Sequence, residues 1–384
     1  MNTNGLKASQ AADITNVSFQ RLAGQKVYLE GEYMLYPLKF KPLYKDYIWG
    51  GRNLASLGKI LPAEGIVAES WEIACHKNGS SIVANGQYAG VPLPELISIL
   101  GRKLLGESLP SQDIDKFPLL IKLIDAESNL SVQVHPDDAF AYEHENGEYG
   151  KNEMWYIISA KPGAKIVYDV MPGTTRESFA QAIASNSVES CLKTVEVFPG
   201  DVINIPAGVV HAIGGGIILA EVQQNSDTTY RIYDYGRTGR QLHIEKALQV
   251  IDFNSAGRKE KYSGVELYLS DGCRKRVVVA SKYFCTEILN INGTVTEMAD
   301  GSKFFIFVFT AGKGWILWEE GKMSVNAGES VLVPAFLGKY SLSGQFTALK
   351  TFRPDIVKDV TAPLKKAGIP EDKMYSEIAG LCQR

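Results

Sequence analysis

The amino-acid sequence predicts a mainly β protein with two small antiparallel β-barrels, a small helical insertion and peripheral helices. Short apolar segments follow one another between residues 129 and 223, separated by Gly, Pro and Asp turns, which is typical of an antiparallel barrel or sandwich. A turn–strand–turn pattern occurs twice, at residues 199–208 and 327–335. The chain has 384 residues, of which 45% are apolar, and this is sufficient for two cores.

The chain is expected to have three parts. Residues 1–33 are polar and lack the apolar core of a signal peptide, so we expect a flexible N-terminal extension. Residues 34–255 are expected to form one β domain, with the helical insertion near residues 174–193. Residues 256–384 are expected to form a second β domain that ends in a C-terminal tail.

The individual elements follow from local patterns. Residues 36–51 favour short extended pieces and turns. Apolar runs bounded by turn residues predict strands at residues 69–74, 117–124, 129–135, 154–159, 165–168, 194–197, 202–205 and 217–223. Helical spacing after a proline predicts a helix over residues 92–105, and further helices are expected over residues 176–192 and from near Glu245.

Charge and cysteine content exclude several classes of protein. Lys and Arg number 40 against 43 Asp and Glu, so the chain has no general attraction for nucleic acid or an anionic membrane. The longest strongly apolar stretch, residues 304–309, is far too short to cross a bilayer. The five cysteines form no CxxC pair, which predicts free thiols in a reducing, cytoplasmic compartment and argues against a disulfide framework.

The repeated pattern indicates where metal chemistry can occur. Each copy has Gly and an acidic residue, then alternating apolar residues, then Pro-Ala, although any two β–turn–β segments could share this pattern. His211 follows the first copy, whereas Lys339 lies nearest the same offset after the second. We therefore expect only the first barrel to bind a metal.

Four polar side chains of the first barrel are candidate metal ligands. In a strand, Gln133 and His135 point to one side and the valines between and before them to the other, so the interior needs a polar occupant. Glu153 begins the next strand, and His211 follows a turn that returns the chain to the same opening. Each residue alone could be a satisfied core or surface residue. Together, two imidazoles, a carboxylate and an amide oxygen suit a divalent ion, zinc above all, with a position open for substrate.

The other three histidines are not assigned to the metal. His144 lies in an acidic stretch, which is typical of a solvated helix end, and His243 lies near a predicted helix start. His76, beside Cys75, could line the same site, but only the dipeptide points to it.

Cationic residues are expected at the same opening. Lys151 lies two residues before Glu153 and would share its face of the strand. Arg231 and Arg237 lie in a polar run that follows the last predicted strand. Lys122 is the one charge in an apolar run, so it either reaches along the surface to solvent or points into the pocket to meet a phosphate.

Four blocks of the sequence closely resemble the type I phosphomannose isomerases, in particular their shorter bacterial branch: FPLLIKLIDAESNLSVQVHPDD, YGKNEMWYII, PGDVINIPAGVVHAIG and QNSDTTYRIYDYGR. The upstream segment AESWEIACHKNGSS is similar to the ESWE segment of that family. The resemblance extends over about residues 35–250 and more loosely over the rest. The combination of QVHPDD, KxE and SDTTYRxYDYGR is specific, whereas each motif alone would be much weaker.

The resemblance implies a cupin fold, with two jelly-roll barrels and a helical insertion. It also implies an aldose–ketose isomerase that interconverts mannose 6-phosphate and fructose 6-phosphate through a cis-enediol. One zinc ion per chain would be bound, by position, by Gln133, His135, Glu153 and His211.

The resemblance further implies roles for the cations. Arg231 matches the arginine beside the reacting carbons, Lys151 the proposed proton shuttle, and Ser131 and Lys122 the phosphate-binding positions. Longer family members have His-Lys-Pro where this chain has GKN at residues 150–152, so no histidine can assist the proton relay there. The base is therefore either the lysine, which a nearby divalent cation would keep neutral by like-charge repulsion, or a zinc-bound hydroxide.

Two other functions share the barrel and the ligand types. An iron-dependent cupin oxygenase is disfavoured by the glutamine in the ligand set and by the cations suited to phosphate. A sugar-binding cupin without catalysis gives no reason for four ligands beside Lys151 and Arg231. For the isomerase, the expected partner is a small sugar phosphate, in a monomer or a homodimer, with no nucleic acid and no membrane.

Overall fold

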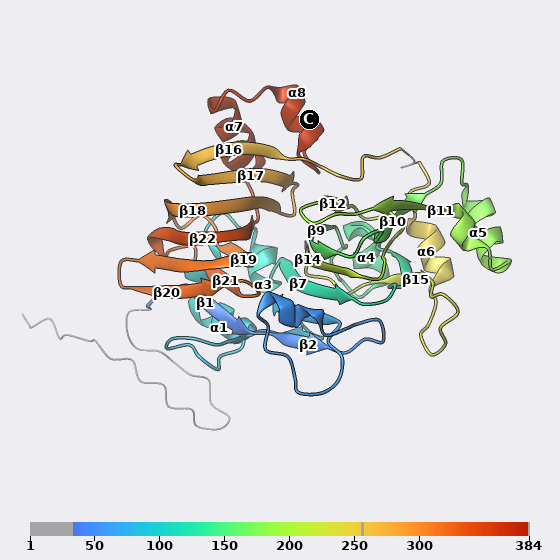
Figure 1. The fold of residues 1–384 in the computed structure, drawn as a ribbon, viewed down its shortest axis with the longest axis horizontal. Helices are drawn as coiled ribbons and strands as arrows, with labels where there is room; N and C mark the ends of the chain where they lie inside the picture. The colour runs from blue at the N-terminus through green and yellow to red at the C-terminus, as the bar shows by residue number, and fades with distance from the viewer. Residues whose placement is uncertain (1–33, 255–256, 383–384) are drawn as a thin grey trace, which may run out of the picture. The chain divides into compact units, whose positions relative to one another are not determined.

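The computed structural model describes residues 34–254 and 257–382, and its helices and strands all belong to the unit Tyr36–Arg384 (Figure 1). The described strands form sheets of nine, six and five strands and a two-stranded ribbon. The predicted mainly β fold class is confirmed. The predicted flexible extension, residues 1–33, lies outside the described residues.

Two antiparallel sheets form the first half. The six-stranded sheet has the order β12-β9-β14-β7-β3-β2 and the five-stranded sheet the order β11-β10-β13-β8-β15. A shared core contains Trp155 from one sheet and Tyr168 from the other. The strands are β2 (Leu43–Lys45), β3 (Glu69–Ile73), β7 (Leu119–Ala126), β8 (Val132–Val134), β9 (Glu153–Ala160), β10 (Lys165–Val170), β11 (Leu192–Glu196), β12 (Val202–Ile205), β13 (His211–Ile213), β14 (Ile217–Gln224) and β15 (Tyr230–Tyr233).

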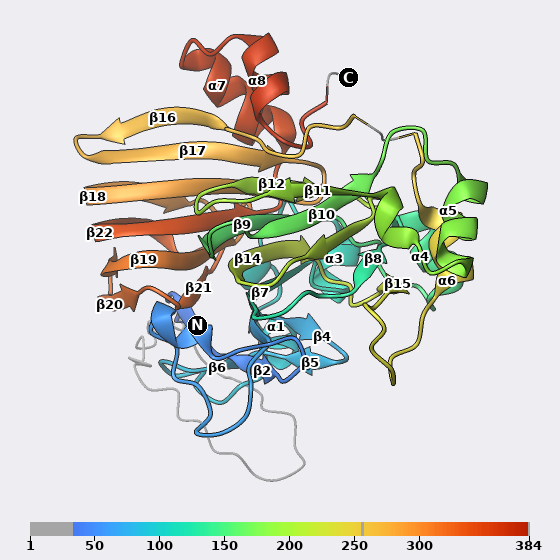
Figure 2. The ribbon, with the colours of Figure 1, turned by 45° about the vertical axis from the view of Figure 1, so that its right-hand side comes forward.

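Helices cover the outer face of the five-stranded sheet (Figure 2). Val132 and Val134 of β8 are fully buried in one core with Phe179 of α5 (Arg176–Ala184) and Ala247 of α6 (Ile244–Val250). The alternate residues of β8 therefore face the space between the two sheets. This side-chain arrangement is the one that the sequence predicts.

Two predicted helices are shorter than expected. In place of one helix over residues 176–192, α5 is followed by the 3-10 helix η2 (Val188–Cys191), with Asn186 between them at a left-handed φ of 55°. In place of one helix over residues 92–105, α1 (Leu93–Leu100) and α2 (Arg102–Leu105) are separated by Gly101. Its φ of 50° and ψ of −125° suit only glycine, which explains the interruption.

The second half is a nine-stranded sheet with the order β16-β17-β18-β22-β19-β21-β1-β6, and β20 pairs with β19. Helices α7 and α8 lie beside β16 and β17 and close the core (Figures 1 and 2). The strands are β1 (Leu38–Lys41), β6 (Ile82–Val83), β16 (Val265–Ser270), β17 (Cys273–Ala280), β18 (Cys285–Ala299), β19 (Phe305–Trp318), β20 (Gly321–Asn326), β21 (Ser330–Val333) and β22 (Gly338–Phe352). The remaining elements are η1 (Asn53–Leu57), α3 (Ser111–Asp115), α4 (Asp138–His144), the ribbon of β4 (Cys75–His76) and β5 (Gly79–Ser80), the π-helix η3 (Ile356–Thr361), α7 (Ala362–Lys366) and α8 (Glu371–Glu377).

The strand order confirms the internal repeat. The order β12-β9-β14-β7-β3-β2 of the first half recurs in the second as β21-β19-β22-β18-β17-β16. The strands β12 and β21, which correspond, are those of the two sequence patterns. The division into two domains near residue 255 stays a prediction.

The repeat extends to a row of residues that are partners across neighbouring strands. Ile203 and Val331 occupy the same place in the two patterns. The row from Ile203 continues through Trp155, Glu221, Lys122 and Trp71, and the row from Val331 through Phe307, Lys350, Glu287 and Val277. Each row therefore has an aromatic residue followed by a charge pair, with the signs of the pair exchanged between the halves.

These charge pairs lie inside the protein. Lys122 is 4% exposed, so the alternative that it reaches solvent is wrong. Its Nζ lies 3.1 Å from Glu221 Oε1, and Lys350 Nζ lies 3.8 Å from Glu287 Oε2. A buried charge requires such a partner.

Polar contacts join the second half to the first. Asp113, whose side chain is 1% exposed, forms an ion pair with Arg353 just after β22. Tyr283 donates a hydrogen bond to Asp138 Oδ2 at 2.8 Å.

No helix in the described part of the chain is long and apolar enough to cross a membrane.

We expect Arg353→Met to lower the free energy of unfolding by about 3 kcal/mol, because the buried carboxylate of Asp113 loses its cation. Urea denaturation followed by tryptophan fluorescence measures the change. The control is Arg274→Met, since that arginine is about half exposed and lies 3.7 Å from Glu266, and its loss should cost less than about 0.5 kcal/mol. Equal losses in the two variants would contradict the structural role of Arg353.

Candidate active site

Two buried imidazoles are held in the same tautomer. His135 follows β8, and its Nδ1 lies 2.9 Å from the carbonyl oxygen of Thr228. His211 begins β13, and its Nδ1 lies 2.9 Å from the carbonyl oxygen of Val209. A carbonyl oxygen only accepts hydrogen bonds, so each Nδ1 carries the proton and each Nε2 keeps a free lone pair. Burial lowers the pKa of His211 to about 3 and that of His135 well below its usual range, so both rings are neutral near pH 7.

Both lone pairs are directed at one carboxylate. Glu153 begins β9, with its Oε1 3.4 Å from His211 Nε2 and its Oε2 3.5 Å from His135 Nε2. Within the described part of the chain, Glu153 Oε1 and His211 Nε2 are buried without a hydrogen-bond partner. Burial, and then the carboxylate of Glu221, raise the pKa of Glu153 to about 7. The group therefore needs a positive charge to be stable in its ionised form.

The three side chains fit a divalent metal ion. Among residues 34–254 and 257–382, they are the one group of His, Cys, Asp or Glu ligand atoms that lie within 4.8 Å of one another. Two neutral imidazoles and a carboxylate are the ligands that zinc binds in catalytic sites. The hydrogen bonds from Nδ1 to main-chain carbonyls are the outer contacts that usually orient such ligands.

Lys151 lies against these ligands. It is 4% exposed, and its Nζ donates hydrogen bonds to His135 Nε2 at 2.9 Å and to Glu153 Oε2. The next residue, Asn152, is fixed by Gln224, whose Oε1 accepts from the Asn152 main-chain N–H and side-chain amide. The lysine therefore extends from a rigid segment.

Gly150 has no space for a side chain. A Cβ atom at this position would lie 2.5 Å from main-chain atoms of Asp137 and Asp138. A histidine there, as in the longer relatives, would require the start of α4 to move. The packing around Gly150 therefore excludes a histidine at this position.

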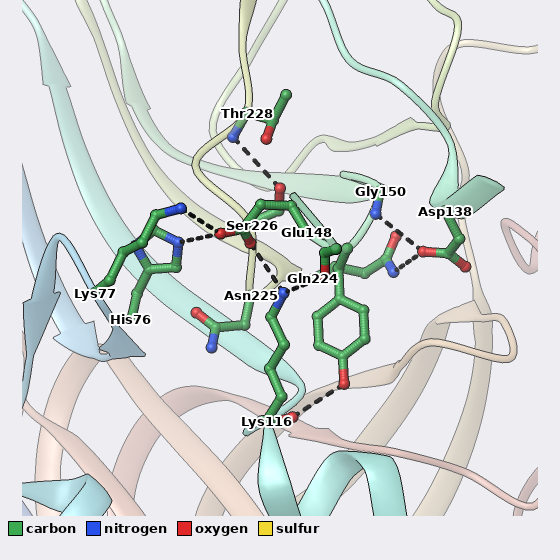
Figure 3. A network of polar contacts seen from close by, with 12 residues as sticks. His76, Lys77, Lys116, Asp138, Glu148, Gly150, Gln224, Asn225, Ser226 and Thr228 are labelled. Atoms are coloured by element: carbon green, nitrogen blue, oxygen red, sulfur yellow. Dashed lines mark hydrogen bonds and ion pairs between the residues drawn. The ribbon is translucent and has the colours of Figure 1, made fainter. Parts of the chain in front are cut away.

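The loop that supplies the Thr228 carbonyl is fixed by side-chain hydrogen bonds (Figure 3). Gln224 Nε2 donates to Asp138 Oδ1 at 2.9 Å, and the same oxygen accepts from the Gly150 N–H at 3.0 Å. Asn225 Nδ2 donates to two main-chain carbonyls at 2.8 Å. The acceptor of His135 is thus held by contacts with neighbouring segments.

A cavity of about 270 Å³ lies beside Lys151. It is lined by all five of the predicted site residues that lie outside the His–Glu–His cluster: Lys122, Ser131, Gln133, Lys151 and Arg231. The structure therefore brings the eight predicted site residues together. Gln133 shares a face of β8 with His135, as predicted.

Other predicted residues lie elsewhere. His76, for which the sequence left open a place in the lining of the metal site, instead lines a different pocket, where Figure 3 shows it beside Glu148. Arg237 is also absent from the cavity lining, because its guanidinium pairs with Asp234 and packs over Tyr235.

The five cysteines are free thiols, as predicted.

Sequence reasoning missed four charged residues of the cavity, Glu69, Glu221, Asp227 and Arg240. Glu221 lies in β14, whose residues are all buried, and a lone charge in an apolar run is the signal that identified Lys122. Burial opposes its ionisation, yet Lys122 and then Lys151 lower the pKa of Glu221 to about 2. Arg240 follows the polar run and had no local signal.

Comparisons with known proteins identify the family of this chain. The chain matches the phosphomannose isomerase type I catalytic domain over residues 37–159 and the mannose-6-phosphate isomerase cupin domain over residues 274–352. It is 38% identical to mannose-6-phosphate isomerase ManA of Bacillus subtilis over 313 residues, which cover 80% of this chain and 96% of that protein. The chain belongs to the type I phosphomannose isomerase family. The family and the cupin fold predicted from the sequence are therefore confirmed.

Further known proteins resemble this chain in sequence or in fold. Mannose-6-phosphate isomerase of Streptococcus mutans is 38% identical over 317 residues, covering 81% of this chain and 96% of that protein. The crystal structure of the Bacillus subtilis mannose 6-phosphate isomerase superposes with a TM-score of 0.75 at 33% identity, covering 82% of this chain and 99% of that one. A phosphomannose isomerase of Salmonella typhimurium, at 17% identity and a TM-score of 0.68, shares the fold; the matched region covers 83% of this chain and 99% of that one.

We expect Glu153→Gln and His211→Ala to lower the affinity for a divalent metal at least about tenfold, because the first removes the negative charge and the second a ligand atom from a buried cluster. Elemental analysis of the dialysed protein measures the bound metal. The control is His144→Ala, whose histidine side chain is 40% exposed at the end of α4. Full metal content in both cluster variants would show that the metal binds elsewhere.

Proposed function

We propose that the chain interconverts mannose 6-phosphate and fructose 6-phosphate through a cis-enediol, with one zinc ion bound per chain. The observation that supports this most directly is the position of Lys151, which contacts two of the candidate ligands and also lines the cavity. Family membership favours this function over an oxygenase or a sugar-binding protein without catalysis. The cytoplasmic location and the oligomeric state, monomer or homodimer, stay predictions.

The proposed zinc ligands are Gln133, His135, Glu153 and His211. His135, Glu153 and His211 form the buried cluster, and Gln133 lies on the same face of β8 in the cavity wall. When bound, zinc would supply Lewis-acid stabilisation of negative charge on the substrate oxygens.

Lys151 is the proposed base. Isomerisation of the open-chain aldose removes the proton from C2 and returns a proton to C1 on the same face, while the hydroxyl proton passes from O2 to O1. One amine that reaches the cavity from a rigid segment can serve both carbons. The amine must be neutral to accept the proton.

Arg231, Ser131 and Lys122 are proposed to act on the substrate from the cavity wall. Arg231 Nε donates to Ser131 Oγ at 3.2 Å, so these two side chains form one polar surface. Arg231 is cationic at any working pH and would stabilise the enediolate rather than accept a proton. Lys122 lines the same cavity but is paired with Glu221, so the phosphate-binding role implied by the resemblance would require it to exchange that partner.

Purified protein with zinc should convert mannose 6-phosphate to fructose 6-phosphate, and a chelator should abolish the conversion because the buried carboxylate loses its cation. A coupled assay for fructose 6-phosphate measures the rate. Addition of zinc after removal of the chelator should restore it. No conversion by zinc-loaded protein would refute the proposed function.

Lys151→Ala and Arg231→Ala should each lower kcat by at least about a hundredfold, because one removes the base and the other the charge beside the enediolate. Both should retain zinc by elemental analysis. The matched control is Lys161→Ala, a lysine that is 63% exposed and paired with Glu127, and its kcat should be unchanged. Normal turnover in either site variant would remove that residue from the mechanism.

A further inference from the structure

The cations of the cavity differ in how far their charges are balanced. Lys122 Nζ lies 3.1 Å from Glu221 Oε1 and 3.7 Å from Glu69 Oε2. Lys151 is paired with Glu153. At this inner end of the cavity each lysine already has a carboxylate partner, so an incoming anion would compete with buried acids.

The arginine end has the opposite balance. Arg231 donates to Ser131 Oγ at 3.2 Å and to the Gln241 carbonyl at 2.8 Å, and both acceptors are uncharged. Arg240 pairs with Asp234, but the same carboxylate also pairs with Arg237.

Among the described residues, no carboxylate forms an ion pair with Arg231. Arg240 and Arg237 share the carboxylate of Asp234, so the positive charge of Arg240 is only partly balanced. Burial, and then Arg240, lower the pKa of Arg231, as expected for neighbouring like charges that no anion separates.

The cavity suits an elongated sugar phosphate, because Lys151 and Arg240 both belong to its lining. The phosphate and the carbonyl of an open-chain sugar 6-phosphate lie at opposite ends of the molecule. The reacting carbons can therefore lie near Lys151 and Arg231 while the phosphate lies near Arg240.

We propose that Arg240 binds the phosphate of the substrate and so determines the preference for phosphorylated sugars. This inference rests on the proposed function. A phosphate monoester is anionic near pH 7, which suits the incompletely balanced positive charge of Arg240. The planar guanidinium presents paired donors to phosphate oxygens, which the ammonium of Lys122 cannot do.

The first test is Arg240→Met, compared with Arg237→Met. Both changes remove one arginine from the same Asp234, but only Arg240 lines the cavity. Arg240→Met should raise KM for mannose 6-phosphate at least about tenfold with kcat within about twofold, whereas Arg237→Met should change neither. Unchanged KM in the Arg240 variant would overturn the proposal.

A second measurement separates this proposal from the proposed function. Inorganic phosphate is titrated into the zinc-loaded proteins by calorimetry, which requires no turnover. Its affinity should fall at least about tenfold in Arg240→Met, to an intermediate extent in Arg240→Lys, and not in Arg237→Met. The Arg240→Lys variant retains a cation beside Asp234, so its fold should be preserved. It therefore distinguishes loss of the guanidinium from loss of folding.

The outcomes then differ for the two proposals. Wild-type protein that binds phosphate through Arg240 without isomerising the sugar would refute the function and retain the phosphate site. Loss of phosphate binding in Lys122→Met but not in Arg240→Met would place the phosphate at the lysine end and overturn this inference. Wild-type protein that does not bind phosphate would overturn it as well.

Discussion

The site depends on two hydrogen bonds from imidazole Nδ1 atoms to main-chain carbonyls. Those of His135 and His211 determine which nitrogen of each ring keeps its lone pair, and both lone pairs then face Glu153. The acceptor carbonyls belong to loops that only the assembled sheets bring to these positions. The ligand set is therefore a product of the fold, and Gln224 and Asp138 contribute to it by holding the loop of Thr228.

The cavity next to these ligands has two electrostatic ends. At one end buried lysines alternate with buried carboxylates, so the local charge is balanced before a ligand enters. At the other, Arg231 has uncharged acceptors and Arg240 shares the carboxylate of Asp234 with Arg237. An elongated anion would therefore enter the cavity in one orientation. A fixed orientation would allow a small cavity to hold one pair of substrate carbons beside the amine of Lys151.

Sequence patterns predicted most of this arrangement, because a strand alternates its faces with period two. That alternation placed Gln133 and His135 together, and the joint pattern added Glu153 and His211. Partners across strands are not visible in a local pattern, so Glu221, opposite Lys122 in the sheet, was missed. The break of a predicted helix at Gly101 and the exclusion of any side chain at position 150 likewise depend on packing and on main-chain conformation.

The exchange of signs between the buried pairs of the two halves bears on their ancestry. Suppose that both halves descend from one duplicated unit that already had the charge pair. Exchanging the two signs by one substitution at a time would then produce an intermediate protein with two like charges side by side in its core. Such an intermediate would lose several kcal/mol, on the order of half the stability of a typical domain. An ancestor without charged residues in this row of cross-strand partners would not require such an intermediate. The pairs Lys122–Glu221 and Glu287–Lys350 are then independent acquisitions, and in the described part of the chain the first lies near the His–Glu–His cluster.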